Sequence, residues 1–169
     1  VTLIKKFVSL PESYSETVKA CIRTVFDSWN NERAIEYRKI NNIDGAMGTA
    51  VNVQMMVFGN MNDRSASGVL FTRDPSTGEN KLTGEYLPNA QGEDVVAGIR
   101  TPLNVWGMET DPNFGVAWTQ LNELCELLEN HYGDMQDVEF TVQDGELYIL
   151  QTRTGKRAAQ AAVKIAHDL

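Results

Sequence analysis

The stretch richest in reactive side chains runs from Met135 to Arg157 and reads MQDVEFTVQDGELYILQTRTGKR. Two runs of alternating apolar and polar residues flank Asp144 and Gly145, which is typical of an antiparallel β-hairpin. A two-residue turn would pair Glu139 with Leu150 and scatter the polar groups over both faces. The preferred prediction is therefore a three-residue loop at 143–145, with Gly145 in the left-handed conformation as a bulge.

This register predicts one polar and one apolar face for the hairpin. The polar face carries Asp137, Glu139, Thr141, Gln151 and Arg153. The apolar face carries Val138, Phe140, Val142, Tyr148 and Leu150. Chemistry is therefore expected on the first face and core packing on the second.

The predicted polar face has the residue types of a metal–nucleotide site. The carboxylate of Glu139, with Asp137 as a further candidate, and the amide oxygen of Gln151 are the hard ligands that Mg²⁺ takes beside water and substrate phosphates. Arg153 offers a planar fork of donors that matches phosphate oxygens and would neutralise charge during phosphoryl transfer. The pattern alone is equally compatible with an exposed sheet face that carries ordinary Glu–Arg pairs.

Other polar residues are weaker candidates. Glu85 and Glu93 flank YLPNAQG, a predicted loop that could fold both carboxylates inward, although exposed loop acids are the simpler interpretation. His131 and His167 have no partner at ligand or nucleophile spacing and are interpreted as surface or capping residues. A glycine-rich loop followed by Lys and Ser or Thr is missing from the sequence, which excludes a Walker-type phosphate site.

Helices are predicted where apolar side chains recur at helical spacing or where alanine is frequent. They cover residues 11–29, with Pro11 in the first turn, and residues 30–40, 111–131 and 155–169. The stripe of the first helix, predicted to face a core, comprises Val18, Cys21, Ile22, Val25, Phe26 and Trp29. The stripe of the third comprises Trp118, Leu121, Leu124, Cys125 and Leu128.

Two strands are predicted before the hairpin. One is the alternating apolar run between Gly48 and Gly59, and the other starts near Ala66 and ends at Asp74. The segment GNMNDRS between them predicts that these two strands pair as a hairpin. With helices and antiparallel strands, and no internal repeat, residues 1–169 are interpreted as one α+β unit.

Composition limits the class of function. A formal net charge of −8 argues against nucleic acid or an anionic membrane as partner. No apolar run approaches the ~20 residues of a membrane span, and no basic-then-apolar signal opens the sequence. Cys21 and Cys125 lack metal-ligand spacing, so reduced thiols in a cytoplasmic protein are expected. Because residue 1 is Val, the sequence is expected to be cut from a longer chain.

Three long stretches resemble the nucleotide-binding domain of the pyruvate, phosphate dikinase family, whose architecture is of the ATP-grasp type. They are WNNERAIEYRK with GTAVNVQMMVFGN, SGVLFTRDPSTGENKLTGEYLPNAQGEDVVAGIRTP, and DMQDVEFTVQDGELYILQTRTGKR. The related water dikinase, phosphoenolpyruvate synthase, shares the general plan but does not ordinarily read NAQGEDVVAGIRTP, and it ranks second. A non-catalytic nucleotide-binding or interaction module is a further alternative.

The resemblance implies roles for individual residues. It assigns Glu139 and Gln151 to Mg²⁺ and ATP, with Asp137 a nearby acid, and places Arg153 at the reacting phosphates as a catalytic residue. Further residues implied at the nucleotide are Glu85 and Glu93, and, through the strand that meets adenine, Gln54, Met55, Met56 and Val57.

The resemblance also implies a larger enzyme. In the family, ATP gives a pyrophosphoryl group to a histidine on a mobile domain; phosphate takes one phosphoryl group, and pyruvate on a barrel domain takes the other. Neither His131 nor His167 matches that histidine. The phosphohistidine domain and the barrel are thus expected partners, the parent is expected to be a homo-oligomer, and this chain alone is expected to be inactive.

Overall fold

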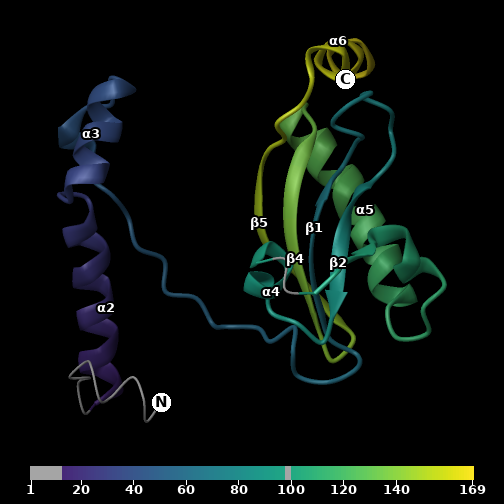
Figure 1. Ribbon diagram of the computed structural model, residues 1–169, viewed down its shortest axis with the longest axis horizontal. Coiled ribbons are helices and arrows are strands. Elements are labelled where there is room, and N and C mark those ends of the chain that lie inside the picture. The colour runs from purple at the N-terminus through teal and green to yellow at the C-terminus, as the bar shows by residue number, and fades with distance from the viewer. Residues whose placement is uncertain (1–12, 98–99) are drawn as a thin grey trace. The chain divides into compact units, whose positions relative to one another are not determined.

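The computed structural model describes residues 13–97 and 100–169 and divides the chain into two compact units, Val1–Met55 and Met56–Leu169 (Figure 1). Each unit is defined by its own internal contacts. That residues 1–169 form one unit of a larger domain therefore stays a prediction.

In the described part of the N-terminal unit, residues 13–55, all regular secondary structure is helical. Helix α2 spans Tyr14–Ser28, α3 spans Glu32–Ile40, and the short 3₁₀ helix η1 spans Gly45–Met47. Both α-helices start at a polar N-cap, because the side chain of Ser13 accepts from the backbone N–H of residue 16 and that of Asn31 from residue 34. The two predicted helices are thereby confirmed, and the predicted first turn at Pro11 lies outside the described residues.

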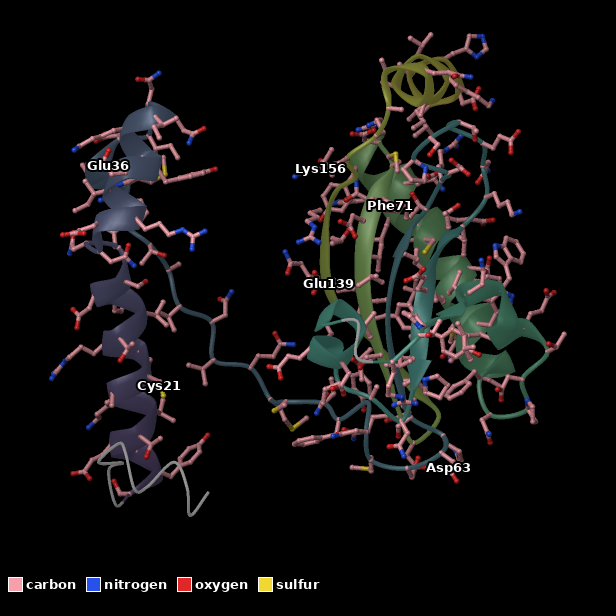
Figure 2. All side chains as sticks on the ribbon, viewed as in Figure 1. Cys21, Glu36, Asp63, Phe71, Glu139 and Lys156 are labelled. Carbon is pink, nitrogen blue, oxygen red and sulfur yellow. The ribbon has the colours of Figure 1, made fainter. Side chains whose placement is uncertain are left out.

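The predicted core-facing stripe of α2 is wrong for the described part of this unit. No residue of α2 is buried, and Val25 and Phe26 are 40% and 49% exposed. Figure 2 shows side chains extending on all sides of α2 and α3. Helical periodicity identifies an apolar face, but burial requires a second element against that face, and residues 13–55 supply none that buries it.

The C-terminal unit is built on a five-stranded antiparallel sheet in the order β3-β2-β1-β4-β5 (Figure 1). Its strands are β1 (Ala66–Phe71), β2 (Thr83–Pro88), β3 (Leu103–Asn104), β4 (Gln136–Gln143) and β5 (Glu146–Thr154). Its helices are α4 (Gly92–Ala97), η2 (Val105–Glu109), α5 (Gly115–Tyr132) and α6 (Ala159–Asp168). An α+β fold with a mainly antiparallel sheet packed against helices is confirmed.

Helix α5 and one face of the sheet enclose the main core. Trp118, Leu121 and Cys125 of α5 are buried against alternate residues of the strands, including Val138 and Phe140. The stripe predicted for this helix is confirmed, because these positions fall on one side at helical spacing. The residues that alternate with these core positions along each strand lie on the opposite face of the sheet.

The strand predicted between Gly48 and Gly59 is wrong. Residues 48–58 form neither helix nor strand, and β1 pairs with β2 on one side and β4 on the other. Both hydrogen-bonding edges of β1 are therefore occupied, so the predicted hairpin between the run and β1 cannot form. The alternating pattern was present, but within the described residues no strand pairs with this run.

The loop of the β4–β5 hairpin differs from the prediction. It has two central residues, Asp144 and Gly145, with φ of 49° and 87°, the positive values that a type I′ turn requires. The extra residue that the prediction placed in the loop is instead Leu150, which forms a β-bulge in β5. Beyond the bulge, Glu139 pairs with Gln151, so these two residues share a face as predicted.

The bulge also corrects the predicted apolar face. Tyr148 pairs with Thr141 on the side predicted to be polar, and Leu150 is 41% exposed. Leu147 and Ile149 pack against the core in their place. The reason is that the segment between turn and bulge keeps the two-residue register, which reverses the orientation of every side chain in it.

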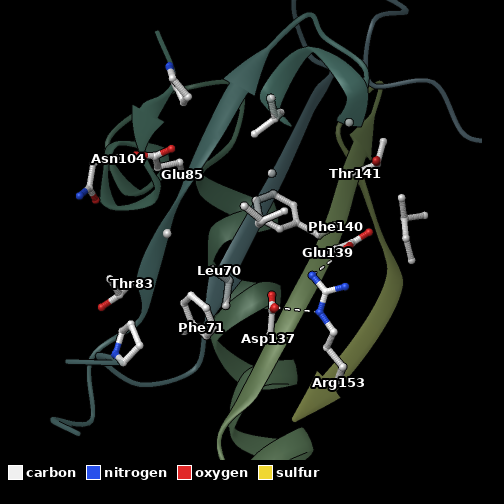
Figure 3. Close-up of a pocket in the computed structure, with 18 of the residues that line it drawn as sticks. Leu70, Phe71, Thr83, Glu85, Asn104, Asp137, Glu139, Phe140, Thr141 and Arg153 are labelled. Atoms are coloured by element: carbon white, nitrogen blue, oxygen red, sulfur yellow. Dashed lines mark hydrogen bonds and ion pairs between the residues drawn. The ribbon is translucent and has the colours of Figure 1, made fainter. Parts of the chain in front are cut away.

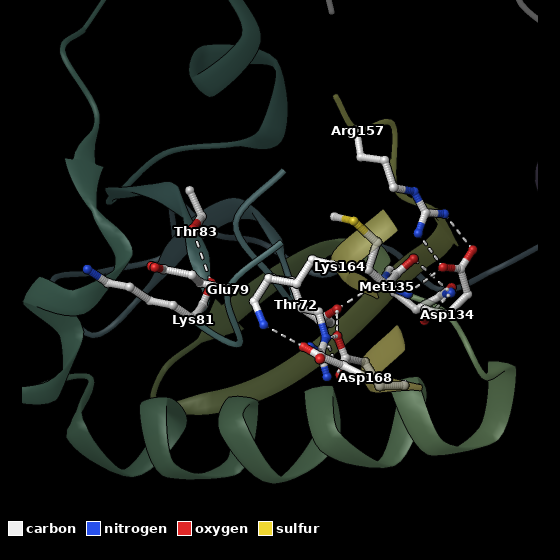
Figure 4. A network of polar contacts seen from close by, with 12 residues as sticks. Thr72, Glu79, Lys81, Thr83, Asp134, Met135, Arg157, Lys164 and Asp168 are labelled. Atoms are coloured by element: carbon white, nitrogen blue, oxygen red, sulfur yellow. Dashed lines mark hydrogen bonds and ion pairs between the residues drawn. The ribbon is translucent and has the colours of Figure 1, made fainter. Parts of the chain in front are cut away.

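A buried polar network joins β1, α5 and α6. The side chains of Arg73 and Glu129 are 5% and 9% exposed, and the Arg73 Nε donates to both Glu129 carboxylate oxygens at 3.0 and 3.1 Å. Thr72 Oγ1 donates to Glu129 at 2.6 Å, and Arg73 Nη1 reaches Asp168 at 3.1 Å. Lys164 also binds Asp168 (Figure 4). These pairs hold α6 at the end of the sheet.

A second ion pair joins the segment between β5 and α6 to the residues just before β4. Arg157 binds the carboxylate of Asp134 through both terminal nitrogens, with Nη2 to Oδ2 at 2.6 Å (Figure 4). The hydrogen bond from Arg157 lowers the pKa of Asp134 below its usual value, and the same bond raises the pKa of Arg157. This pair lies outside the cavity described below.

Both cysteines are free, Cys21 exposed on α2 and Cys125 buried in the core. Burial raises the pKa of the Cys125 thiol to about 12, with a further contribution from the nearby Glu129 carboxylate. Within residues 13–97 and 100–169, no helix combines the length and the apolarity that crossing a membrane requires.

Candidate functional site

The sheet face opposite α5 lines a cavity of about 1250 Å³ (Figure 3). Side chains alternate along β4, so that Val138 and Phe140 pack in the core while Asp137 and Glu139 turn to the cavity. Helix α4 lies against β1 and β2 and contributes further to the lining. The cavity is therefore formed within the C-terminal unit.

A single row of paired residues crosses all five strands on this face. Asn104 pairs with Glu85, Glu85 with Val69, Val69 with Glu139, and Glu139 with Gln151. Two strand spacings separate the backbones of Glu85 and Glu139, which is about 9 to 10 Å. The row thus brings Glu85, Glu139 and Asn104, from segments far apart in the sequence, to the lining of the cavity, whereas Gln151 pairs with Glu139 at the end of the row and does not line it.

Arg153 extends over the neighbouring row and binds two acids. Its Nε donates to Asp137 Oδ2 at 2.8 Å, and its Nη2 lies 3.3 Å from Glu139 Oε1 (Figure 3). The hydrogen bond to Asp137 is the largest cause of a raised Arg153 pKa, with smaller contributions from the charges of Asp137 and Glu139. The guanidinium therefore stays positive and is held at the cavity wall.

The bulge at Leu150 decides that Arg153 reaches this face. With the bulge, Arg153 pairs with Asp137; in the register that holds near the turn, it would face Gln136, which is 2% exposed. One extra residue thus moves the guanidinium from the core side to the cavity side. Bulges beside functional sites commonly re-aim side chains in this way.

Glu85 and Glu93, the acids that flank the predicted loop, both line the cavity. Glu85 lies within β2, and Glu93 lies in the first turn of α4. Asn104 completes the row from β3, and sequence reasoning missed it. No local signal marks Asn104, because its place beside Glu85 follows from the pairing of two strands.

The four residues predicted to contact adenine do not line the cavity. Met56 and Val57 belong to the C-terminal unit and do not line its cavity. Gln54 and Met55 belong to the N-terminal unit, where Met55 is 83% exposed. The role of Gln54, Met55, Met56 and Val57 stays a prediction.

The donor set suits a metal that takes part of its shell from a substrate. Among the described residues, no group of three or more His, Cys, Asp or Glu side chains could hold a metal ion by itself. Glu139 and Gln151, paired across two strands, offer one carboxylate and one amide oxygen. That fits Mg²⁺, which keeps several waters and completes its coordination with phosphate oxygens.

The chain matches the protein family described as pyruvate phosphate dikinase, AMP/ATP-binding domain, over residues 9–113 and 116–169. A chloroplastic pyruvate, phosphate dikinase from Mesembryanthemum crystallinum is 57% identical over 165 residues, which is 98% of this chain and 17% of the relative. Pyruvate, phosphate dikinase 1, chloroplastic, from Arabidopsis thaliana is 55% identical over 170 residues, covering 100% of this chain and 17% of the relative.

These relatives bear on two expectations from the sequence. The expected cytoplasmic location is contradicted, because the relatives from Mesembryanthemum crystallinum, Flaveria trinervia and Arabidopsis thaliana are all named chloroplastic. The chain spans only about a sixth of the length of the relatives it matches, in keeping with a piece of a larger enzyme. By its match to the family over nearly all residues, the chain belongs to the pyruvate phosphate dikinase AMP/ATP-binding domain family.

Proposed function

We propose that this chain supplies one wall of the ATP- and Mg²⁺-binding site of a pyruvate, phosphate dikinase. The observation that carries the proposal is the cavity wall on which Arg153, Asp137 and Glu139 meet, beside the row that contains Glu85 and Gln151. A cation fork next to hard oxygen ligands is the arrangement that a metal–triphosphate requires. The description of the matching family, an AMP/ATP-binding domain, supports ATP as the nucleotide.

Each residue has a part in this proposal. Glu139 and Gln151 would hold Mg²⁺, which neutralises phosphate charge when bound. Arg153 binds oxygens of the transferred group, where its planar fork is worth most as negative charge develops. Glu85, two strands away from Glu139, and Glu93 on α4 also line the cavity and are proposed to bind the rest of the nucleotide through its hydroxyls or metal-bound waters.

The proposed reaction is pyrophosphoryl transfer to a histidine outside this chain. A histidine nitrogen lone pair forms a bond to the β-phosphorus of ATP, and the bond from that phosphorus to the oxygen bridging to the α-phosphate breaks. The electron pair leaves with that oxygen on AMP. Phosphate and then pyruvate are the proposed acceptors on the full enzyme, with pyrophosphate and phosphoenolpyruvate as products.

The test is Arg153→Ala in the full-length enzyme that contains this chain. Because a guanidinium aimed at the transferring group meets more charge in the transition state than in bound ATP, its loss is expected mainly in the chemical step. Single-turnover formation of AMP should slow by on the order of 10²- to 10³-fold, while ATP affinity changes far less. Exchange between phosphoenolpyruvate and pyruvate on the phosphorylated enzyme should stay nearly intact.

Arg157→Ala is the matched control, because Arg157 also binds an acid near the end of the hairpin but lies outside the cavity. This control should leave AMP formation within about threefold of the parent, as expected for a residue distant from the chemistry. Equal loss of both half-reactions in Arg153→Ala, or loss of ATP affinity alone, would show that Arg153 has a structural or simple binding role.

A further inference from the structure

The two acids that bind Arg153 do so differently. Asp137 accepts a hydrogen bond from Nε at 2.8 Å, whereas Glu139 lies 3.3 Å from Nη2 as a looser ion pair. The Asp137 side chain is 17% exposed and the Glu139 side chain is 35% exposed. The tighter contact therefore comes from the more buried acid.

The sheet register separates the two acids further. Asp137 stands directly opposite Arg153, so the shortest path from its carboxylate leads to the guanidinium. Glu139 stands opposite Gln151 and has that amide as a second neighbour. Asp137 therefore has Arg153 as its partner, whereas Glu139 lies between Arg153 and Gln151.

The Arg153 side chain needs such a support. It is 53% exposed and projects from β5, whose other edge is not paired within the described residues. A long exposed side chain samples many rotamers, and a bond at Nε fixes the plane of the guanidinium while leaving its outer nitrogens able to donate elsewhere.

From this geometry we propose that Asp137 is a positioning residue, which orients Arg153 toward the transferred phosphates and is not itself a metal ligand. The inference rests on the proposed function. Asp137 retains Nε throughout, and Glu139 exchanges its loose pair with Nη2 for its role at the metal. The proposal differs from the sequence-based prediction, which named Asp137 as a further candidate ligand for the metal.

Full-length enzyme carrying Asp137→Asn provides the kinetic test. The variant keeps the size of the side chain and one acceptor oxygen but loses the charge. Single-turnover AMP formation should slow by on the order of 10- to 100-fold, since a misplaced reacting group costs about that much, with ATP affinity within about threefold. In the Arg153→Ala background, the same change should slow the reaction by no more than about twofold, because Asp137 acts through Arg153.

Two readouts do not depend on turnover. Mn²⁺ titration of the enzyme with a non-hydrolysable ATP analogue, followed by electron paramagnetic resonance, should show weaker binding in Glu139→Gln and unchanged binding in Asp137→Asn. A crystal structure of metal-free Asp137→Asn should show Arg153 in more than one rotamer. Asp134→Asn is the matched control, because it disrupts the Asp134–Arg157 pair near the end of the hairpin and should change neither readout.

The outcomes separate the two proposals. If Asp137→Asn weakens Mn²⁺ binding as much as Glu139→Gln does, or slows the Arg153→Ala enzyme by a further 10-fold or more, Asp137 is not a positioning residue, and the proposed function stands. A single, unchanged Arg153 rotamer in the Asp137→Asn crystal also overturns the inference. If Glu139→Gln leaves Mn²⁺ binding unchanged and Arg153→Ala leaves AMP formation unchanged, the proposed function fails instead.

Discussion

Replacing Glu129 by Ala should be among the most destabilising single changes in the C-terminal unit. The substitution leaves the Arg73 guanidinium, whose side chain is 5% exposed, without its main partner. Breaking a buried ion pair by removing one partner costs about 3 to 5 kcal/mol. Because Asp168 still contacts Arg73 Nη1 at 3.1 Å, the lower end of that range applies.

Thr72 adds a second contribution. Its hydroxyl donates to Glu129 at 2.6 Å and would lose that acceptor, which costs about 1 kcal/mol for a buried hydroxyl. The expected loss in the free energy of unfolding is therefore about 4 kcal/mol. Glu126→Ala on the same helix, at an exposed position, should change it by less than about 0.5 kcal/mol and serves as the control.

Urea unfolding followed by tryptophan fluorescence measures this difference. Trp106 and Trp118 contact each other in the C-terminal unit with ring centroids 5.0 Å apart and planes tilted by 59°, and a Trp29→Phe background removes the signal of the N-terminal unit. At a slope of ~2 kcal/mol per molar urea, a loss of 4 kcal/mol lowers the midpoint by about 2 M.

The double variant Arg73→Met with Glu129→Met tests the stated cause. If the loss comes from an unpaired buried charge, removing both partners should restore the free energy of unfolding to within about 2 kcal/mol of the parent. A Glu129→Ala loss below about 1 kcal/mol, or a double variant as unstable as the single one, would refute the reasoning.

Two further predictions concern the thiols and the Asp134–Arg157 pair. Cys21 should react readily with a thiol reagent at pH 8 while Cys125 stays unmodified until the chain unfolds, since Cys125 is buried with a pKa of about 12; mass spectrometry counts the labels, and rapid double labelling of native protein would contradict this. Asp134→Asn should cost on the order of 1 kcal/mol near neutral pH, because the pair is only partly buried. The folded-state pKa of Asp134 is lowered, so its contribution is present above the ordinary value of 3.8 and is lost as the pH falls below it. Chemical unfolding of Asp134→Asn and parent protein from pH 7 to pH 2 should therefore converge only in the acid range, and a constant difference there would contradict the assignment.

Several features follow from local sequence alone. The apolar stripe of α5 predicts its buried face, because helical spacing places Trp118, Leu121 and Cys125 on one side. Asp144–Gly145 predicts a turn, since both residues tolerate positive φ. The types of residue in the hairpin also predict the chemistry of a metal–nucleotide site. These features need only neighbours in sequence.

Other features depend on how distant segments meet. The bulge at Leu150 sets which face Arg153 takes, and it reflects competition between turn geometry and the burial of Leu147 and Ile149. The pairing of Asn104 with Glu85 depends on β3 returning beside β2 after helix α4, which no local pattern encodes. The predicted three-residue loop was wrong, although Glu139, Gln151 and Arg153 do share one face of the hairpin as predicted.

Local sequence accounts for the two strands of the hairpin, for helix α5 and for the residue types of the candidate site, and it carries the family resemblance. Contacts between distant segments account for the pairing of β1 with β2 and β4, and for the lack of a strand at residues 48–58 in the described structure. They also decide that Arg73 and Glu129 are a buried pair, and that Asp137 rather than Glu139 holds the Arg153 Nε. Pairing, burial and hydrogen-bond choice are settled between segments tens of residues apart, where local propensity carries no information.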